Sequence, residues 1–403
     1  MDTRAWEYLE ILGGITDELP GLTRTFLSPA LERAKQVVAR WMEEAGLTVF
    51  EDQAGNLIGR WDCGDPHAGT FVVGSHLDTV RDAGRFDGAL GVVLGVLAAR
   101  RLKGEGVRRS HHLEVVGFSD EEGVRFQTTY LGSRHYCGTL GEREKAFADS
   151  EGITVEQAIA AHRPRWPLPP PRRVIGYVEA HIEQGPVLEK SGLGLGVATA
   201  IAGQTRARVV VEGEAGHAGT TPMHLRKDAL AGAAECIVMI EQRARETDGI
   251  VATVGEVKIR SAASNVIPGR VEFTIDLRSA DDSMRARFSH EVFVEIESVA
   301  KRRGLAVQID LPLDASSTNC SPVLCDRLAE VVRNRQGICP MLVSGAGHDA
   351  VALAEVAPTA LLFVRCRGGL SHHPDEYASP QDVSAALDVL VEFLKAIPEI
   401  IRT

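Results

Sequence analysis

Histidine, aspartate and glutamate residues form four small clusters in this sequence, and each cluster follows an apolar run. The clusters hold His76 with Asp78, Glu121 with Glu122, His181, and His372 with His373. Imidazole and carboxylate ligands without thiolates suit Zn²⁺, and also Mn²⁺, Co²⁺ or Ni²⁺. The residue types therefore indicate metal-dependent chemistry.

The motif His76-Leu77-Asp78 places an imidazole and a carboxylate two residues apart at a strand end, so both side chains point the same way. In one interpretation His76 is a metal ligand whose ring is oriented by Asp78. In the other, the two residues form a hydrogen-bonded structural pair. Asp87, just before a helical pattern, also has two interpretations, because it either caps that helix or bridges two metal ions with its two oxygens.

Glu121 and Glu122 leave a strand-like run as neighbours. Neighbouring residues of a strand point in opposite directions, so one glutamate can bind metal while the other is a general base. The alternative is an acidic turn exposed to solvent. His181 and His372, taken singly, also fit buried core histidines. Taken together, the five candidate ligands and the base favour a two-metal site at the ends of several strands.

A two-metal site of this composition hydrolyses amides. Two divalent ions ~4 Å apart polarise a carbonyl group and lower the pKa of a bound water from ~15.7 toward ~7. The sequence leaves the identity of the metal open between Zn²⁺ and Mn²⁺, with Co²⁺ and Ni²⁺ as further alternatives.

The elements that must position these residues are short apolar runs rich in Val, Ile and Phe, which predict buried strands. These runs are 70–74, 113–118, 174–179 and 360–364. Helical patterns lie between them, for example over 89–102, and a helix capped by Ser379 begins at Pro380. The alternation predicts an α/β fold, in which ligands bind beyond the carboxyl ends of the strands.

The middle of the chain has a different order of elements. It predicts strands over 207–211, 250–259, 270–277 and 306–311, with helices over 223–245 and 283–303. This β-α-β-β-α-β order is typical of a ferredoxin-like layer. We therefore expect a domain over 207–318, inserted into a discontinuous catalytic domain made of 1–206 and 319–403.

Charge and hydropathy exclude several classes of partner. The 403 residues contain 44 Lys and Arg against 55 Asp and Glu, a net charge of −11, and no basic stripe that would neutralise nucleic-acid phosphates. The longest apolar run is far shorter than the ~18 residues expected of a membrane span. The first ten residues lack the pattern of a secretory signal, so we expect a cytoplasmic location.

With these residues assembled, the chain resembles the metal-dependent amidohydrolases that cleave N-carbamoyl groups. These are N-carbamoyl-L-amino-acid hydrolase, allantoate amidohydrolase and β-ureidopropionase, within the M20 metallopeptidase-like superfamily. The resemblance rests on GSHLDTV (Gly74 to Val80), GRFDGALGV (Gly84 to Val92), FSDEEGVRF (Phe118 to Phe126), HIEQGPVLE (His181 to Glu189), GHAGTTPM (Gly216 to Met223), SNVIPG (Ser264 to Gly269), SGAGHDA (Ser344 to Ala350) and GLSHHPDE (Gly369 to Glu376).

The resemblance implies a role for each matching residue. The positions that match the metal ligands are His76, Asp87, Glu122, His181 and His372, with Asp87 bridging. Glu121 matches the general base, and Asp78 would steady His76. The positions that match substrate contacts are Gln204, His217, Asn265 and Arg278. Relatives commonly have Asn after the last histidine, whereas this chain has His372-His373, so the sequence leaves open which of the two is the ligand.

The resemblance also implies a reaction and an assembly. We expect hydrolysis of the ureido C–N bond of a small N-carbamoyl acid, such as an N-carbamoyl-L-amino acid or allantoate, with release of ammonia and CO₂. We also expect a homodimer in which the inserted domain is both lid and dimer interface. The alternatives are an M20-type peptidase or N-acyl-amino-acid deacylase with the same metals and, more remotely, a non-catalytic dimeric binding protein of the same fold.

Overall fold

The computed structural model describes residues 3–260 and 263–400, and it divides into two compact units. One unit combines Met1–Thr199 with Cys320–Thr403, and the other is Ala200–Asn319. The sequence predicts boundaries at 207 and 318. The observed boundary near 200 lies earlier because the first long strand of the second unit already begins at Gly203 and pairs along its whole length.

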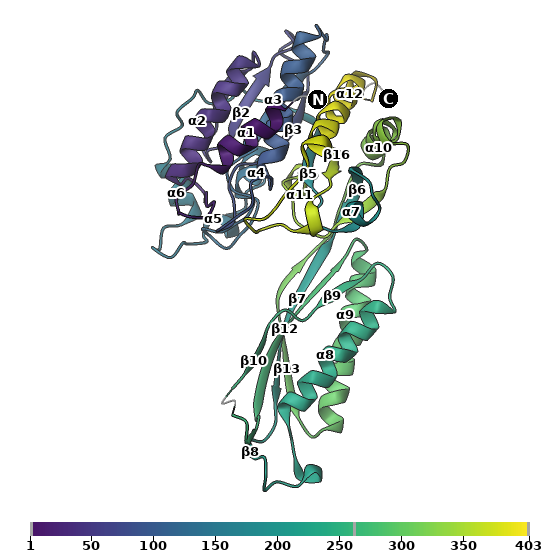
Figure 1. The fold of residues 1–403 in the computed structure, drawn as a ribbon. Coiled ribbons are helices and arrows are strands. Elements are labelled where there is room, and N and C mark those ends of the chain that lie inside the picture. The colour runs from purple at the N-terminus through teal and green to yellow at the C-terminus, as the bar shows by residue number, and fades with distance from the viewer. Residues whose placement is uncertain (1–2, 261–262, 401–403) are drawn as a thin grey trace. The chain divides into compact units, whose positions relative to one another are not determined.

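The first unit is built on a mixed sheet (Figure 1), which has nine strands among the described residues when β14, a short strand at the end of the second unit's segment, is included. Its strands are β1 (Thr48–Glu51), β2 (Leu57–Trp61), β3 (Thr70–His76), β4 (His112–Phe118), β5 (Val174–Ile182), β6 (Leu195–Ile201), β14 (Thr318–Asn319), β15 (Met341–Ser344) and β16 (Thr359–Val364). They are ordered β1-β2-β4-β3-β5-β16-β6-β14, and β15 pairs with β6.

The four apolar runs that precede the predicted clusters are β3, β4, β5 and β16, and they lie next to one another in the order β4-β3-β5-β16. All three pairings among them are parallel. Parallel strands have their carboxyl ends at one edge of the sheet, and ligands of open α/β sheets bind at that edge. The pairing therefore brings together clusters that are separated by up to three hundred residues of chain.

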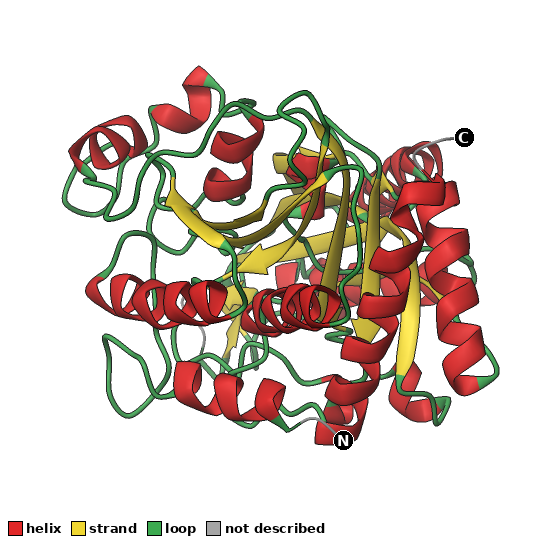
Figure 2. Ribbon diagram, turned by 90° about the horizontal axis from the view of Figure 1, so that it is seen from above, coloured by secondary structure: helices red, strands yellow, loops and turns green. Residues whose placement is uncertain are grey.

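Helices lie on both sides of these strands (Figure 2). The helices of this unit are α1 (Arg4–Gly13), α2 (Pro29–Glu44), α3 (Ala89–Gly104), α4 (Leu131–Cys137), α5 (Glu142–Lys145), α6 (Val155–Ala161), α7 (Val187–Lys190), α10 (Pro322–Gln336), α11 (Ala350–Leu353), η2 (Arg367–Gly369) and α12 (Pro380–Ile400). The predicted start of α12 is confirmed, since the Ser379 hydroxyl accepts the Asp382 N–H at 3.0 Å.

The second unit has an antiparallel sheet ordered β10-β12-β7-β13, with β9 also paired to β12. Its elements are β7 (Gly203–Glu212), β8 (Gly216–His217), η1 (Met223–Leu225), α8 (Ala229–Arg245), β9 (Val251–Thr253), β10 (Val257–Ile259), β11 (Val266–Ile267), β12 (Arg270–Ser279), α9 (Asp282–Arg302) and β13 (Ala306–Ala315). The predicted α/β class and the separate layer of strands and helices are confirmed.

Two predicted elements of this unit differ from the observed ones. The helix expected from 223 begins at Ala229, because the Asp228 carboxylate caps it by accepting the N–H groups of Leu230 and Ala231 at 3.0 Å each. The strand expected over 250–259 is two strands, β9 and β10. Both pair with β12, but their registers differ by one residue, as they do across a β-bulge.

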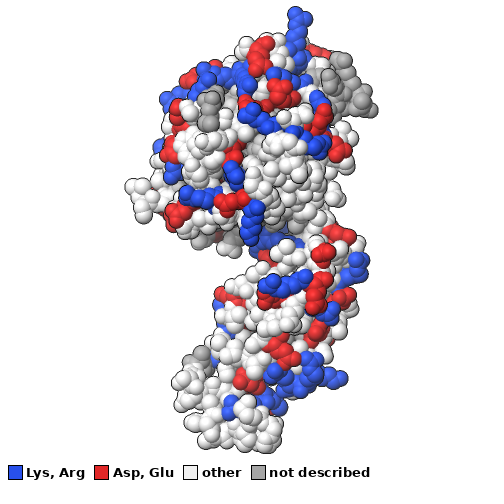
Figure 3. Space-filling model, turned by 45° about the vertical axis from the view of Figure 1, so that its right-hand side comes forward, with Lys and Arg blue, Asp and Glu red and all other residues white. Residues whose placement is uncertain are grey.

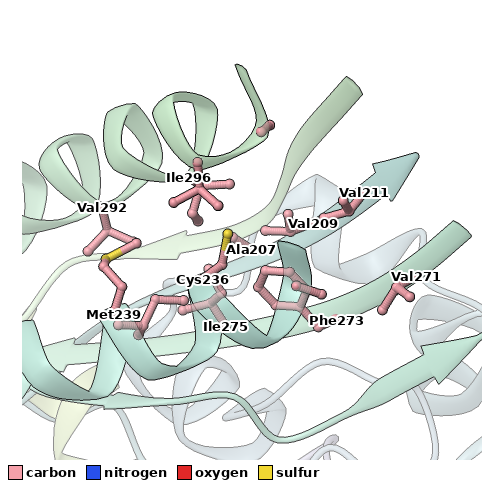
Figure 4. Packing of buried hydrophobic residues seen from close by; sticks show 14 of the residues in the cluster. Ala207, Val209, Val211, Cys236, Met239, Val271, Phe273, Ile275, Val292 and Ile296 are labelled. Carbon is pink, nitrogen blue, oxygen red and sulfur yellow. The ribbon is translucent and has the colours of Figure 1, made fainter. Parts of the chain in front are cut away.

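Strict alternation along β12 decides which residues of the second unit are available for chemistry. Val271, Phe273 and Ile275 point inward and pack with Cys236 of α8 and Ile296 of α9 (Figure 4). The residues between them face outward and are polar. The apolar side chains therefore hold the helices on one face of the sheet and leave the other face for charged groups.

Acidic and basic side chains are interspersed on the face of the molecule shown in Figure 3, and they form no broad basic stripe there. Among the residues that the structure describes, none of the helices has the length and apolar character needed to cross a bilayer.

Candidate metal centre and substrate-binding residues

The predicted ligands lie at or beyond the carboxyl ends of adjacent parallel strands. His76 is the last residue of β3, His181 lies in β5, Glu121 and Glu122 follow β4, Asp87 precedes α3, and His372 follows η2. The structure brings all of them together in the first unit.

Asp87 lies at the centre of this group. Its Oδ1 is 3.3 Å from His76 Nε2 and 3.1 Å from His181 Nε2, whereas its Oδ2 is 3.3 Å from His372 Nε2. His372 Nε2 also lies 3.4 Å from Glu122 Oε1. The two oxygens of Asp87 thus separate the predicted ligands into two sets, which is the arrangement required of a carboxylate that bridges two metal ions.

Backbone carbonyl groups orient two of the imidazole rings. His76 Nδ1 is 3.0 Å from the carbonyl oxygen of Asp78, and His181 Nδ1 is 2.9 Å from that of Ile182. A carbonyl oxygen only accepts, so each Nδ1 donates this hydrogen bond, and each Nε2 faces Asp87 as the nitrogen available for a metal ion.

The Asp78 side chain contacts more than its predicted partner, His76. Its Oδ1 is 3.5 Å from His76 Nδ1, and the backbone carbonyl of the same residue is closer to that nitrogen. The carboxylate also accepts the backbone N–H of Glu121 at 3.0 Å and that of Glu122 at 3.1 Å. Asp78 therefore holds both the ring of His76 and the turn that carries the two glutamates.

A second group of polar residues, which the sequence reasoning missed, surrounds Asp87. Glu376 Oε1 accepts the backbone N–H groups of Phe86 at 2.8 Å and Asp87 at 3.0 Å. The Ser371 hydroxyl lies 2.9 Å and Gln184 Nε2 lies 3.0 Å from Asp87 Oδ2. The sequence signal for these residues is that each lies within four positions of a predicted histidine ligand, in the motifs HIEQGPVLE and GLSHHPDE.

Gly88 is required by the close approach of the turn to the first histidine. Its φ is +65°, and a Cβ at this position would lie 2.4 Å from the His76 ring. Gly88 itself is the N-cap of α3 and no side chain caps the helix, so the alternative interpretation of Asp87 as a helix cap is wrong.

Of the two adjacent histidines, His372 is the one at the site. Its Nε2 faces Asp87 and Glu122, and its φ of +55° is an unusual backbone conformation for a non-glycine residue. His373 Nδ1 instead accepts the backbone N–H of Asp375 at 3.1 Å.

The charges of the site fit a divalent cation. Burial, together with Asp87 and Glu121, raises the pKa of Glu122 to about 9, and burial and nearby carboxylates also hold the pKa of Glu121 well above its usual range. Glu121 is buried and the Glu122 side chain is only 9% exposed, so the alternative of a solvent-exposed acidic turn is wrong. The crowding of buried carboxyl groups thus disfavours their ionised forms, and a bound cation, for which imidazole and carboxylate groups are suitable ligands, would favour those forms again.

The four predicted substrate contacts lie in the second unit, as two pairs. Gln204 and Arg278 are cross-strand partners in β7 and β12, and both donate to Asp276. One edge of the Arg278 guanidinium, the planar group by which this predicted substrate contact could bind a carboxylate, is engaged here by that aspartate. His217 and Asn265 form the other pair, since His217 faces Val266 in the β8–β11 pairing and the Asn265 carbonyl accepts the Ala218 N–H at 2.9 Å.

The fold and this site are those of a hydrolase of the M20 family. Residues 72–396 match the family model described as peptidase family M20/M25/M40, a family of typically metal-dependent enzymes, and the chain belongs to it. It is 40% identical to allantoate deiminase of Arabidopsis thaliana, over 96% of this chain and 81% of the relative. It is 41% identical to N-carbamoyl-L-amino acid amidohydrolase of Geobacillus stearothermophilus, over 96% of both chains.

A solved structure of a hydantoinase/carbamoylase family amidase from Burkholderia ambifaria superposes with a TM-score of 0.91 at 36% identity, covering 98% of this chain and 96% of that one. Within the M20 family, the chain is therefore a member of the hydantoinase/carbamoylase amidohydrolases. The resemblance and the enzyme class predicted from the sequence are confirmed.

Proposed function

We propose that this protein hydrolyses the ureido C–N bond of a small N-carbamoyl acid, such as an N-carbamoyl-L-amino acid or allantoate, and releases ammonia and CO₂. The observation that carries the proposal is the division of the ligands around Asp87, with His76 and His181 on one oxygen and His372 on the other. Relatives about 40% identical over almost the whole chain carry the names of ureido hydrolases.

We assign two divalent ions to the site, Zn²⁺ or Mn²⁺, with Co²⁺ or Ni²⁺ as alternatives. His76 and His181 would hold one ion and His372 with Glu122 the other, and Asp87 would be shared by both. When bound, the ions supply Lewis acidity to the scissile carbonyl group.

The protein residues perform the proton transfers. Glu121 is held beside His76 and Glu122, with candidate ligand atoms of all three within 4.8 Å of one another. In the proposed reaction a carboxylate oxygen of Glu121 accepts a proton from the attacking water and donates it to the leaving nitrogen. His217 donates a hydrogen bond to the oxyanion that forms on the carbonyl oxygen.

The second unit supports a homodimer. Arg278 and Arg270 lie toward opposite ends of β12, eight residues apart, which corresponds to about 27 Å at the rise of an extended strand. The pair Gln204 and Arg278 lies at one end, and β8 with β11 continues beyond the other. One chain therefore cannot place both predicted pairs on one small substrate, and His217 and Asn265 would come from the partner subunit.

The test is a substrate panel on the enzyme loaded with Mn²⁺ or Zn²⁺. It contains an N-carbamoyl-L-α-amino acid, N-carbamoyl-β-alanine and allantoate, with a dipeptide and an N-acetyl amino acid as comparisons. We expect ammonia from at least one ureido acid and no cleavage of the comparison substrates. Cleavage of the dipeptide or the N-acetyl amino acid alone would support the peptidase or deacylase alternative, and no turnover of any substrate would support the binding protein.

A further inference from the structure

Asp276 lies at the centre of a polar cluster on the outward face of the antiparallel sheet. Its Oδ1 accepts a hydrogen bond from Arg278 Nε at 2.8 Å, and its Oδ2 accepts one from Arg278 Nη2 at 3.1 Å. Gln204 Nε2 also donates to Oδ2, and Arg206 Nε lies 3.4 Å from the same oxygen. One carboxylate thus holds three side chains that come from two strands.

The strand pairing places these groups together. Asp276 and Arg278 are two residues apart in β12, so they share the outward face, while Leu277 between them is buried in the core. Gln204 is the cross-strand partner of Arg278 in β7, and Arg206 is that of Asp276. The register of β7 and β12 therefore fixes which residues are neighbours in the cluster.

The cluster borders an open space. Arg206, Asp276 and Arg278 line a hollow of about 640 Å³ on this face, together with Thr274 and Pro312. Burial disfavours the charge of Asp276, but Arg278, Gln204 and Arg206 outweigh this effect and hold the pKa of Asp276 below its usual range. Asp276 is thus a carboxylate at neutral pH, and its charge keeps the guanidinium in place beside the hollow.

We propose that Asp276 is a positioning residue, which holds Arg278 and Gln204 in the orientation in which they receive the carboxylate of the ureido acid. The inference rests on the proposed function. A free arginine side chain samples many rotamers, and fixing it before the substrate arrives removes that ordering cost from binding. The bidentate pair with Asp276 also fixes the plane of the guanidinium, on which recognition of a second carboxylate depends.

The test compares Asp276→Asn with a matched control, Glu272→Gln. Glu272 lies on the same face of β12 and accepts a hydrogen bond from Arg208 Nη2 of β7 at 2.6 Å. The exposed fractions of the two carboxylate side chains are similar, 28% for Asp276 and 20% for Glu272. Each variant removes one negative charge from a cross-strand pair, but only Asp276 contacts Arg278 and Gln204.

Steady-state kinetics are measured on the best ureido acid of the panel. We expect Asp276→Asn to raise KM about tenfold and to change kcat less than about twofold, because a charge-assisted contact of the binding arginine is lost. Glu272→Gln leaves both constants at the wild-type values. In an Arg278→Gln background, adding Asp276→Asn raises KM less than about twofold, since the residue acts through Arg278.

Several outcomes would overturn the inference. A lower KM in Asp276→Asn would mean that Asp276 competes with the substrate for Arg278. If Asp276→Asn and Glu272→Gln changed KM equally, Asp276 would have a structural role only. The same conclusion would follow if the changes in KM caused by Asp276→Asn and Arg278→Gln were fully additive in the double variant. The second variant is Asp276→Ser, in which a smaller side chain replaces the carboxylate. We expect the same rise in KM and the same small change in kcat as for Asp276→Asn.

The inference and the proposed function fail in different ways. A wild-type enzyme that releases no ammonia from any ureido acid overturns the proposed function, and the positioning role with it. An active wild-type enzyme whose KM is unchanged by Asp276→Asn overturns the positioning role alone.

Discussion

The buried carboxylate of Glu376 accepts the backbone N–H of Asp87 at 3.0 Å, although the two residues are 289 positions apart in the chain. The same oxygen accepts the N–H of Phe86, and Ser371 lies between the Glu376 side chain and Asp87 Oδ2. The residue that separates the two predicted metal sites is thus held by the C-terminal segment of the same unit.

Replacing Glu376 by Ala should weaken metal binding about 10- to 100-fold, the usual effect of removing a group that orients a metal ligand. The cause is the loss of the acceptor for two buried backbone N–H groups beside Asp87. Metal affinity is measured by calorimetric titration of the metal-free protein. Asp375→Ala, at an exposed neighbour, is the control, and equal affinities in the two variants would contradict the prediction.

Gly88→Ala should lose most of its bound metal, because the new Cβ would lie 2.4 Å from the His76 ring. The matched control is Gly106→Ala, at a φ of +69° with nothing within 4 Å of its Cβ. Both variants place a side chain at a positive φ, with the larger backbone strain at Gly88, whose ψ is −53°, but only the first displaces a ligand. Metal content per chain and thermal unfolding distinguish the two effects, and full occupancy in Gly88→Ala would refute the argument.

Glu121→Gln should retain the metal ions and lose turnover by about 10²- to 10⁴-fold, because the amide cannot accept the proton of the attacking water. Metal content is measured beside ammonia release. A variant that binds metal and hydrolyses ureido acids at nearly the wild-type rate would exclude Glu121 as the base.

His372→Ala and His373→Ala should differ strongly although the residues are neighbours. His372 Nε2 faces Asp87 and Glu122, whereas His373 accepts a backbone N–H from its own turn. We expect His372→Ala to lose metal and activity and His373→Ala to retain both, as measured by metal content and ammonia release. The reverse result would identify His373 as the ligand.

Glu51→Gln should destabilise the protein by about 3 kcal/mol at neutral pH. Burial opposes the charge of Glu51, but His162 and Lys35 outweigh it and lower the pKa to about 2. A carboxylate whose pKa is lowered by folding stabilises the fold when the pH is above its pKa in the unfolded chain, near 4.5. This contribution is lost as the pH falls toward 2. Denaturant unfolding of the wild type and the variant checks this prediction. The difference between their free energies of unfolding should become smaller below pH 4.5. A difference that stays constant would show that the ionisation of Glu51 is not the cause.

The sequence predicted the parts of the molecule that depend on local pattern. The runs before His76, Glu121, His181 and His372 are strands because they are short and apolar, and the strand predicted over 270–277 lies within β12. It did not predict the start of α8 or the split of β9 from β10. The start of α8 depends on the cap at Asp228, and the separation of β9 from β10 depends on a change of register against β12. Hydrophobic periodicity contains no information on either feature.

By itself, then, the sequence determined which residue types stand at strand ends and hence the chemistry available to them. The tertiary structure alone decided that Asp87 lies between three histidines, that His372 and not His373 faces it, and that Asp276 holds Arg278. The reason is physical. These contacts depend on strand pairing and turn geometry between segments up to 290 residues apart, and no local spacing in the chain carries that information.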